Sequence, residues 1–197
     1  LRIRGATGEQ LIKVKALFID ELPRLKKKIE VLFIAVKSND TQKVLTLVKP
    51  YLAEDAWVLS AQNGINEDVI IPIVGKSNTI GCSVRTGGTL REPGVVTEGG
   101  TEGVGFIVGE LDGQITPRVK EIARILSLCR RTEITTDIWL ERWNKLATVS
   151  MSSALSVVTG LGSGQLFASE KAHRVFARIL VEAVQVATTL GYRIESI

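Results

Sequence analysis

The sequence predicts an α/β fold followed by an all-α segment, with a doubly wound sheet in the first part. In the first half, apolar runs alternate with stretches of helical periodicity, and the joints between them are short. In the second half the strand-like runs stop, and long helical stretches take their place. A chain of 197 residues with 45% hydrophobic content can bury a substantial core in one or two compact units.

The N-terminal segments are predicted to form strands. Residues 1–5 and 11–18 alternate apolar and polar side chains around a glycine-containing region, which indicates a hairpin or two edge strands. Residues 31–37, VLFIAVK, form a continuous apolar run with β-branched residues, as expected of a strand covered on both faces. Helical spacing of apolar residues follows over residues 41–50.

The alternation of strand and helix then repeats. Residues 56–62, AWVLSAQ, indicate a second strand that stops at Asn63 and Gly64, and a helix follows to about Gly75. Strand, helix, strand and helix with short joints predict consecutive right-handed βαβ units, from which doubly wound sheets are built.

The remainder of the chain changes from strands to helices. Residues 80–110 are rich in short β segments and predict a meander that extends the same sheet. One helix is expected at about 116–129, a long helix contains Lys145, and a last helix covers about 169–190.

Two domains are expected, with a boundary near residue 132. Residues 1–131 form a partial nucleotide-binding sheet that lacks its first βα unit, and residues 132–197 form a partial helical domain. No G-x-G-x-x-G loop is present, because GLGSG at residues 160–164 has another spacing and follows a helix. We interpret that segment as a helix stop.

Polar residues follow both predicted parallel strands at their carboxyl ends. The first junction carries Lys37, and the second carries Gln62 and Asn63. Doubly wound sheets bind ligands at this edge, so these side chains are candidates to line a cleft. The alternative is that Ser38, Asn39 and Asn63 serve only as helix caps and turn formers.

Lys145 stands at the start of a long stretch without charge, since the next charged residue is Glu170. At about 100° per residue, the side chains on its side of the helix are small or polar: Thr148, Val149, Ser152, Ser153 and Ser156. The opposite side is apolar and predicts a core face: Trp139, Trp143, Met151, Ala154, Val157 and Val158. A lysine among small residues suits a ligand cavity. The alternative is a lysine with a packed stem and its head in solvent.

Composition argues against several other classes of protein. The net charge of +4 comes from scattered residues and one cluster, Arg24 and residues 26–28, which lacks the interleaved aromatics of a nucleic-acid site. Cys82, Cys129 and His173 lie too far apart in sequence for a recognisable metal or disulfide framework, so we expect no metal and a reducing cytoplasm. The uncharged run of residues 146–169 is too rich in serine and glycine for a membrane span.

Four segments in this order resemble the ketopantoate reductase family, also called 2-dehydropantoate 2-reductases: VLFIAVKSNDT, VLSAQNGINED, TLREPGVV and WLERWNKL. The resemblance covers nearly the whole chain. It implies a partial Rossmann domain that binds NADPH, joined to a helical domain like that of 6-phosphogluconate dehydrogenase. It also implies that the chain begins after the glycine-rich loop and ends before a segment that completes the site.

The resemblance assigns roles to individual residues. Lys37 and Asn63 match positions that contact NADPH, with Asn63 also near the substrate, and Gly88 matches a small residue beside the cofactor. Lys145 matches the catalytic lysine and also contacts the substrate. Hydride arriving at the 2-oxo carbon creates an alkoxide, which a nearby ammonium stabilises and protonates.

The chain departs from the family where substrate is held. Characterised members have asparagines at the positions of Val149, Ser153 and Ser163. Serine offers one hydroxyl and valine no polar group, so Ser153 and Ser163 are expected to bind substrate more weakly than the amides they replace.

Three functions remain open from the sequence. The first is NADPH-dependent reduction of ketopantoate to pantoate, on the route to pantothenate. The second is the same reaction on a different, less polar 2-oxo acid, and the third is a family member without catalysis. Retention of Lys145 argues against the third. We expect a small-molecule substrate, no nucleic acid and no membrane partner, with homodimerisation left open.

Overall fold

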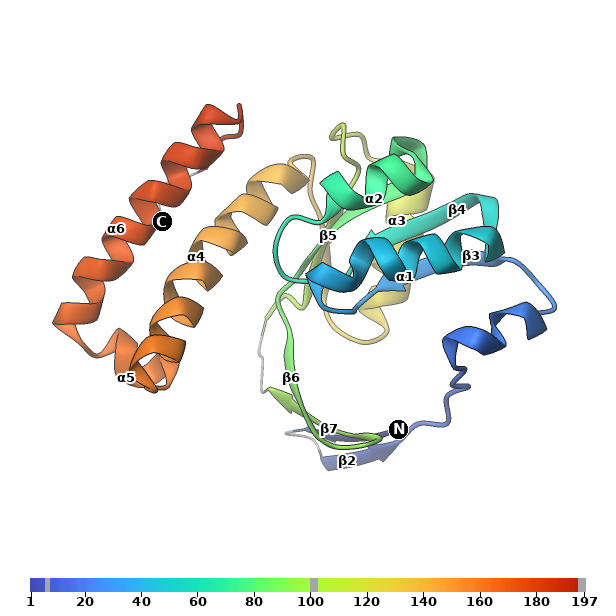
Figure 1. Ribbon diagram of the computed structural model, residues 1–197, viewed down its shortest axis with the longest axis horizontal. Helices are drawn as coiled ribbons and strands as arrows, with labels where there is room; N and C mark the ends of the chain where they lie inside the picture. The colour runs from blue at the N-terminus through green and yellow to red at the C-terminus, as the bar shows by residue number, and fades with distance from the viewer. Residues whose placement is uncertain (6–7, 100–102, 195–197) are drawn as a thin grey trace.

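The computed structural model describes residues 1–5, 8–99 and 103–194, and it confirms an α/β region followed by a helical region (Figure 1). The main sheet has five strands in the order β3-β4-β5-β8-β9. These strands are β3 (Ile29–Ile34), β4 (Leu52–Ser60), β5 (Thr79–Val84), β8 (Phe106–Gly109) and β9 (Thr132–Ile134). As predicted, β3, β4 and β5 run parallel, whereas β8 is antiparallel to β5.

Helices cover both faces of the main sheet. α1 (Thr41–Val48) and α2 (Glu67–Val74) pack on one face, and α3 (Pro117–Ser127) packs on the other. In β4, Val58 contacts the cluster under α1 and α2, whereas its neighbour Leu59 contacts the cluster under α3. Successive side chains of a strand point to opposite faces, so both must be apolar, which explains the continuous apolar runs in the sequence. Short 3-10 helices complete this region: η1 (Ile19–Arg24), η2 (Ser38–Asp40), η3 (Lys49–Tyr51) and η4 (Lys76–Asn78).

A second sheet lies beside the first and corrects one prediction. Its four strands are, in order, β2 (Gly8–Leu11), β1 (Arg2–Gly5), β7 (Val95–Gly99) and β6 (Gly87–Glu92). The N-terminal hairpin is confirmed as β1 and β2, although residues 12–18 are not a strand. The prediction that residues 80–110 extend one sheet was wrong for β6 and β7. Every residue of β6 is exposed, so this strand has no apolar face to bury, and β7 pairs with β1 instead.

The helical region is an antiparallel pair with a short connection. Its helices are α4 (Ile138–Thr159), α5 (Ser163–Phe167) and α6 (Glu170–Thr189). The Asp137 side chain caps α4 by accepting from the Leu140 N–H at 3.0 Å, and Gly160 ends it in the left-handed conformation at φ 69°. The helix stop predicted at residues 160–164 is therefore confirmed. Met151, Leu166, Ala172 and Phe176 form the small core between the three helices.

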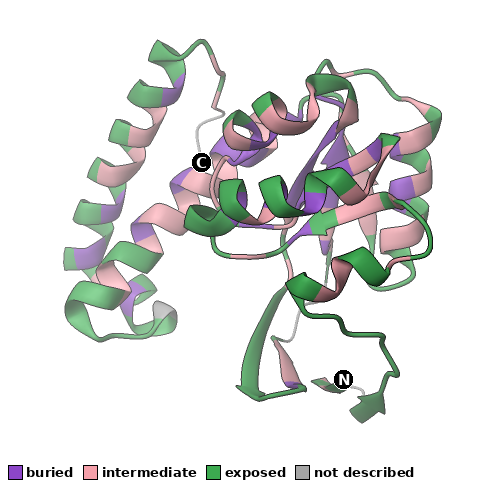
Figure 2. Ribbon diagram, turned by 45° about the vertical axis from the view of Figure 1, so that its right-hand side comes forward, coloured by how far each residue is buried: buried purple, intermediate pink, exposed green. Residues whose placement is uncertain are grey.

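The predicted core face of α4 is only half correct. Trp143 and Met151 are buried, but Val157 and Val158 are 85% and 82% exposed. Figure 2 shows exposed positions, in green, along much of the helical region. The apolar stripe is a property of one helix, whereas the burial of its residues depends on which other elements pack against that helix. At the last turn of α4 no other described element covers these valines.

The last strand of the main sheet is β9, which pairs with β8 and ends at Ile134, and α4 begins at Ile138. Among the described residues, no helix combines the length and the apolar character needed to cross a bilayer.

Two glycines let α4 begin directly on the sheet. A Cβ on Gly81 of β5 would overlap the Ile138 side chain, which is fully packed. A Cβ on Gly109 of β8 would lie 2.6 Å from the Thr135 carbonyl oxygen and 3.2 Å from Ile138 Cβ. The absence of side chains at these positions sets how closely α4 approaches β5 and β8.

We predict that Gly109→Ala lowers the free energy of unfolding by about 1–3 kcal/mol, because the methyl group overpacks a contact with fixed backbone. Thermal or urea unfolding measures this. Gly87→Ala is the matched control, since Gly87 also lies in a strand but has no atom within 4 Å of its added Cβ. Equal stability of the two variants would show that α4 can move away from the sheet at little cost.

Candidate functional site

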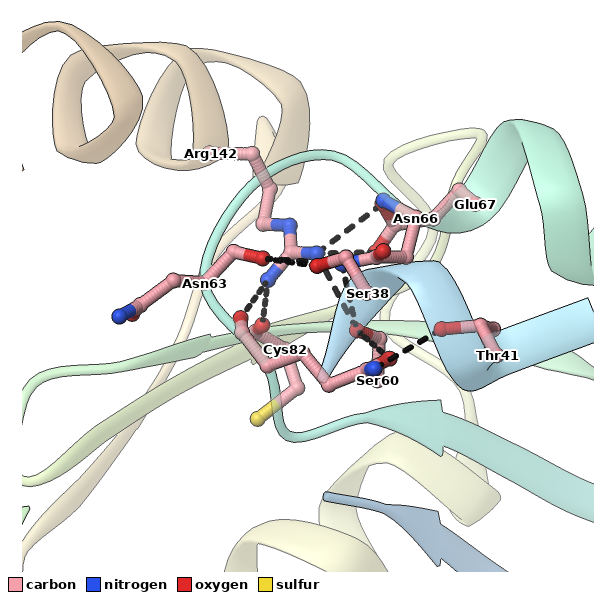
Figure 3. Close-up of polar contacts among 9 residues, drawn as sticks. Ser38, Thr41, Ser60, Asn63, Asn66, Glu67, Cys82 and Arg142 are labelled. Atoms are coloured by element: carbon pink, nitrogen blue, oxygen red, sulfur yellow. Dashed lines mark hydrogen bonds and ion pairs between the residues drawn. The ribbon is translucent and has the colours of Figure 1, made fainter. Parts of the chain in front are cut away.

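Arg142 joins the helical region to the main sheet through a buried ion pair. Its side chain on α4 and that of Glu67 on α2 are 2% and 1% exposed. The guanidinium Nη2 lies 3.1 Å from both carboxylate oxygens of Glu67 (Figure 3). A charge buried this deeply is tolerated only when a partner compensates it, so the two residues depend on each other.

Three further oxygens accept from the same guanidinium. Nη1 donates to the Cys82 carbonyl at 2.6 Å and to the Gln62 carbonyl at 3.3 Å, and Nη2 donates to Ser60 Oγ at 3.4 Å. These acceptors stand at the carboxyl end of β4 and in β5. Arg142 therefore contacts the edge of the sheet at which doubly wound folds bind their ligands.

The buried polar network extends from Arg142 to the ends of β3 and β4. Ser60 Oγ donates to Gln62 Oε1 at 3.2 Å. The Gln62 amide donates to the Val36 carbonyl at 2.6 Å and to Thr41 Oγ1 at 2.9 Å, which ties the end of β3 to the start of α1. Gln62, expected to face a cleft, is in fact a buried part of this network.

Lys145 lies on α4, three residues after Arg142, and its side chain reaches the end of β5. It is half-buried, and its Nζ donates a hydrogen bond to the Val84 carbonyl. Burial lowers the pKa of Lys145 to about 8, and the charges of Arg142 and Arg85 contribute. Burial also raises the pKa of the nearby Cys82 thiol to about 11, so the thiol carries no charge at neutral pH. Lys145 is therefore a partly desolvated ammonium and not a fully solvated one.

The predicted junction residues Lys37 and Asn63 are brought close together. Both are exposed, and Ser38 Oγ donates to the Asn63 carbonyl at 3.1 Å, which joins the two junctions. The Asn63 carbonyl also accepts from the Asn66 amide at 3.0 Å, while the Asn63 side chain points away from this network (Figure 3). The N-caps of α1 and α2 are Asp40 and Asn66, and neither helix has a side-chain cap hydrogen bond, so capping by Ser38, Asn39 or Asn63 is not seen.

Other predicted residues lie on neighbouring elements. Gly88 is exposed in β6, four residues after the last residue of β5. Ser153 is exposed on α4, two turns after Lys145, and Val149 is half-buried between them. Ser163 begins α5, but its side chain lies outside the described atoms.

The side-chain hydroxyl groups of Thr148 and Ser152, which follow Lys145 on α4, donate to carbonyls of the same helix. Thr148 Oγ1 donates to the Asn144 carbonyl at 2.8 Å, and Ser152 Oγ donates to the Thr148 carbonyl at 3.3 Å. These side chains keep the face of α4 beside Lys145 small, and their polar atoms are already partnered.

Sequence reasoning missed the ion pair of Arg142 and Glu67. Each residue alone resembles a charge on the solvent face of a helix, which is the usual place for arginine and glutamate. The available signal was the position of Arg142, one turn before Lys145 on the same side of the helix.

The arrangement places a half-buried ammonium at the carboxyl edge of the sheet, the edge at which doubly wound folds bind ligands. An ammonium with a pKa near the working pH can both stabilise a developing negative charge and deliver a proton to it. The exposed ends of Lys37 and Asn63 add a second cation and an amide at the same edge.

Comparison with known proteins identifies similar chains over nearly the whole length. A family model described as ketopantoate reductase PanE/ApbA matches residues 1–113, and the model of its C-terminal part matches residues 137–196. The 2-dehydropantoate 2-reductase of Aquifex aeolicus (strain VF5) is 26% identical over 192 residues, which are 94% of this chain and 60% of that protein. The chain thus spans about three fifths of the length of such relatives.

Solved structures share the fold. A PanE/ApbA family ketopantoate reductase from Ralstonia eutropha JMP134 superposes with a TM-score of 0.82 at 25% identity, over 100% of this chain and 63% of that one. D-mandelate dehydrogenase, solved with NADH and anilino(oxo)acetate, superposes with a TM-score of 0.84 at 18% identity, over 99% of this chain and 62% of that one.

We predict that Lys145 titrates near pH 8. Acylation by an anhydride requires the neutral amine, so its rate at Lys145, followed by peptide mass spectrometry, should reach half of its maximum near this pH. An unfolded peptide with the same sequence is the reference, for which the midpoint should lie near the ordinary lysine value of about 10.4. Coincident midpoints for the folded chain and the peptide would show that Lys145 is fully hydrated.

Proposed function

The chain belongs to the ketopantoate reductase PanE/ApbA family, and on that basis we propose that the intact protein reduces a 2-oxo acid to a 2-hydroxy acid with a nicotinamide cofactor. The observation that supports this most directly is the placement of Lys145, a partly buried ammonium at the carboxyl edge of the sheet. The nominal substrate is ketopantoate, and the nominal product is pantoate.

The residues at the sheet edge fit a dinucleotide. Lys37 provides an exposed cation for anionic groups, and the exposed amide of Asn63 provides donors and an acceptor for polar groups. Gly88, in β6 beyond the end of β5, is proposed to lie beside the cofactor, where it would add no side chain. The bound cofactor supplies the hydride. We propose NADPH, and titration with NADPH and NADH in parallel tests this preference.

Lys145 is proposed to hold and protonate the substrate oxygen. Of the three N–H groups of its ammonium, one donates to the Val84 carbonyl, so others can donate to a carbonyl oxygen at the same edge. As the carbon is reduced, that oxygen gains negative charge and takes the proton from Nζ. Burial and the charge of Arg142 favour the neutral amine that remains, which is the physical sense of the lowered pKa.

A second candidate is a reductase of a less polar 2-oxo acid. At the positions where family members carry asparagines, this chain has Val149, half-buried and without a polar side-chain atom, and the exposed hydroxyl of Ser153. Ser163 occupies the third position. A hydroxylated substrate gains fewer hydrogen bonds here than from amides.

We predict that Lys145→Ala in the intact protein lowers kcat by roughly 10²–10⁴-fold, because a positioned general acid is lost. The fold should persist, since alanine favours the helix and Lys145 has no buried ion-pair partner among the described residues. Steady-state kinetics at saturating cofactor, together with thermal melting, measures both effects. Lys171→Ala, an exposed lysine on α6, is the control and should retain normal turnover. Turnover within twofold of wild type for Lys145→Ala would contradict the assignment.

We predict that ketopantoate is not the best substrate in a panel of 2-oxo acids compared by kcat/KM. Replacing Ser153 and Ser163 together by asparagine should raise kcat/KM for ketopantoate, because two amide groups are restored. The effect of two hydrogen bonds is on the order of 1–3 kcal/mol, or about 5- to 150-fold. Clear preference of the wild type for ketopantoate would reject the second candidate and leave the first.

A further inference from the structure

We infer that Arg142 is a positioning residue for Lys145: its guanidinium, held by Glu67 and by carbonyl groups of the sheet, fixes the turn of α4 that presents Lys145 at Val84. This inference rests on the proposed function of Lys145 as the proton donor. It assigns a role to a residue that does not itself contact the reacting atoms.

β5 leaves two carbonyl groups without a partner strand. The Arg85 N–H donates to the Gly105 carbonyl at 2.7 Å, so residue 85 faces β8. Because polar groups of a strand alternate between its two edges, the carbonyls of Cys82 and Val84 face the other edge. β4 lies on that edge but pairs with β5 only as far as Ile80. Two carbonyls of β5 therefore extend past the end of their neighbouring strand.

Beyond the end of this pairing with β4, two side chains of α4 donate hydrogen bonds to the carbonyls of β5. Arg142 donates to the Cys82 carbonyl, and Lys145 donates to the Val84 carbonyl. The two donors are three residues apart on one face of α4, and the two acceptors are two residues apart on one edge of β5, so the two contacts lie side by side. A shift of α4 that breaks the first contact also displaces the second.

The shape of the Arg142 guanidinium suits this position. It contacts α2, the end of β4 and β5 at once, through Glu67, Ser60 and Cys82. A planar fork with donors in several fixed directions can make these contacts together, whereas a single ammonium cannot. This geometry, and not the charge alone, holds α4 in register with the strand ends.

The charges around Lys145 are set by the same contacts. Arg142 precedes it on α4, and Arg85 beyond β5 is paired with Glu141 at 2.5 Å. Cys82 faces it from β5 as a neutral thiol, and Glu67 of α2 lies behind Arg142. Loss of Arg142 removes a nearby positive charge and loosens the burial of Lys145, and both changes raise the proton affinity of the amine.

The decisive variant removes both buried charges together. Arg142→Met with Glu67→Gln leaves no buried ion without a partner, so the fold is expected to survive. We expect kcat of the intact protein to fall at least tenfold, with KM for the cofactor within about threefold of wild type. The acylation midpoint of Lys145 should rise from about 8 toward 10.5. Arg142→Lys keeps the charge but loses the fork, and it should also lose at least tenfold in kcat.

A second ion pair provides the matched control. Glu110, directly after β8, and Arg118 of α3 form a partly buried pair away from the edge that carries Lys145. Arg118→Met with Glu110→Gln should lower the melting temperature and leave both kcat and the Lys145 midpoint unchanged. The control therefore separates loss of general stability from loss of positioning.

The outcomes separate this inference from the proposed function. A Lys145 midpoint that stays near 8 in the double variant, kcat within twofold of wild type there, or full activity of Arg142→Lys would each overturn the positioning role. If the intact protein shows no reductase activity, the proposed function fails. The acylation midpoint still decides in that case whether Arg142 positions Lys145, since it is measured without turnover. Should the double variant unfold, Arg142→Lys decides the question: a loss of at least tenfold in kcat supports the positioning role, and full activity overturns it.

Discussion

The buried pair of Arg142 and Glu67 is the interaction on which the rest of the candidate site depends. Removing two charges from water costs several kcal/mol per ion, and the cost is offset only where geometry and additional hydrogen bonds are good. Here the guanidinium meets one carboxylate and oxygens from Ser60, Gln62 and Cys82. Because these partners come from α2, β4 and β5, the pair holds the helical region at one place on the sheet. Removing one partner would leave the other charge buried and alone.

From this constraint the environment of Lys145 follows. One turn after Arg142, its ammonium reaches a strand carbonyl and loses part of its hydration, which lowers its pKa to about 8. The glycines at positions 81 and 109 permit the approach, since side chains there would push α4 away from the sheet. Backbone space, a buried ion pair and a partly desolvated lysine thus form one connected arrangement. Under the proposed function, this arrangement places the proton donor at the edge where doubly wound sheets bind ligands.

The second sheet and the end of α4 differ from the packing that the local sequence patterns predicted. β6 and β7 have strand character in the sequence, yet β7 pairs with β1, from the other end of the α/β region, and not with the main sheet. Val157 and Val158 continue an apolar stripe, yet nothing described packs against them. In both cases the local conformation was predicted correctly, and the error concerned the partner. Conformation depends on near neighbours in sequence, whereas the partner is chosen by burial and edge pairing across the whole chain.

The sequence by itself determined the succession of β3, α1, β4 and α2, the end of α4 at Gly160, and the polar junctions at Lys37 and Asn63. These features depend on periodicity, turn residues and strand ends, which are local. Family resemblance added the candidate role of Lys145. Only the tertiary structure decided that Arg142 and Glu67 are buried and that Lys145 contacts Val84. Arg142 lies 60 residues from Cys82 and 75 from Glu67, so no local pattern distinguishes these charges from solvated ones. Their burial arises only when α4 closes over the ends of the strands.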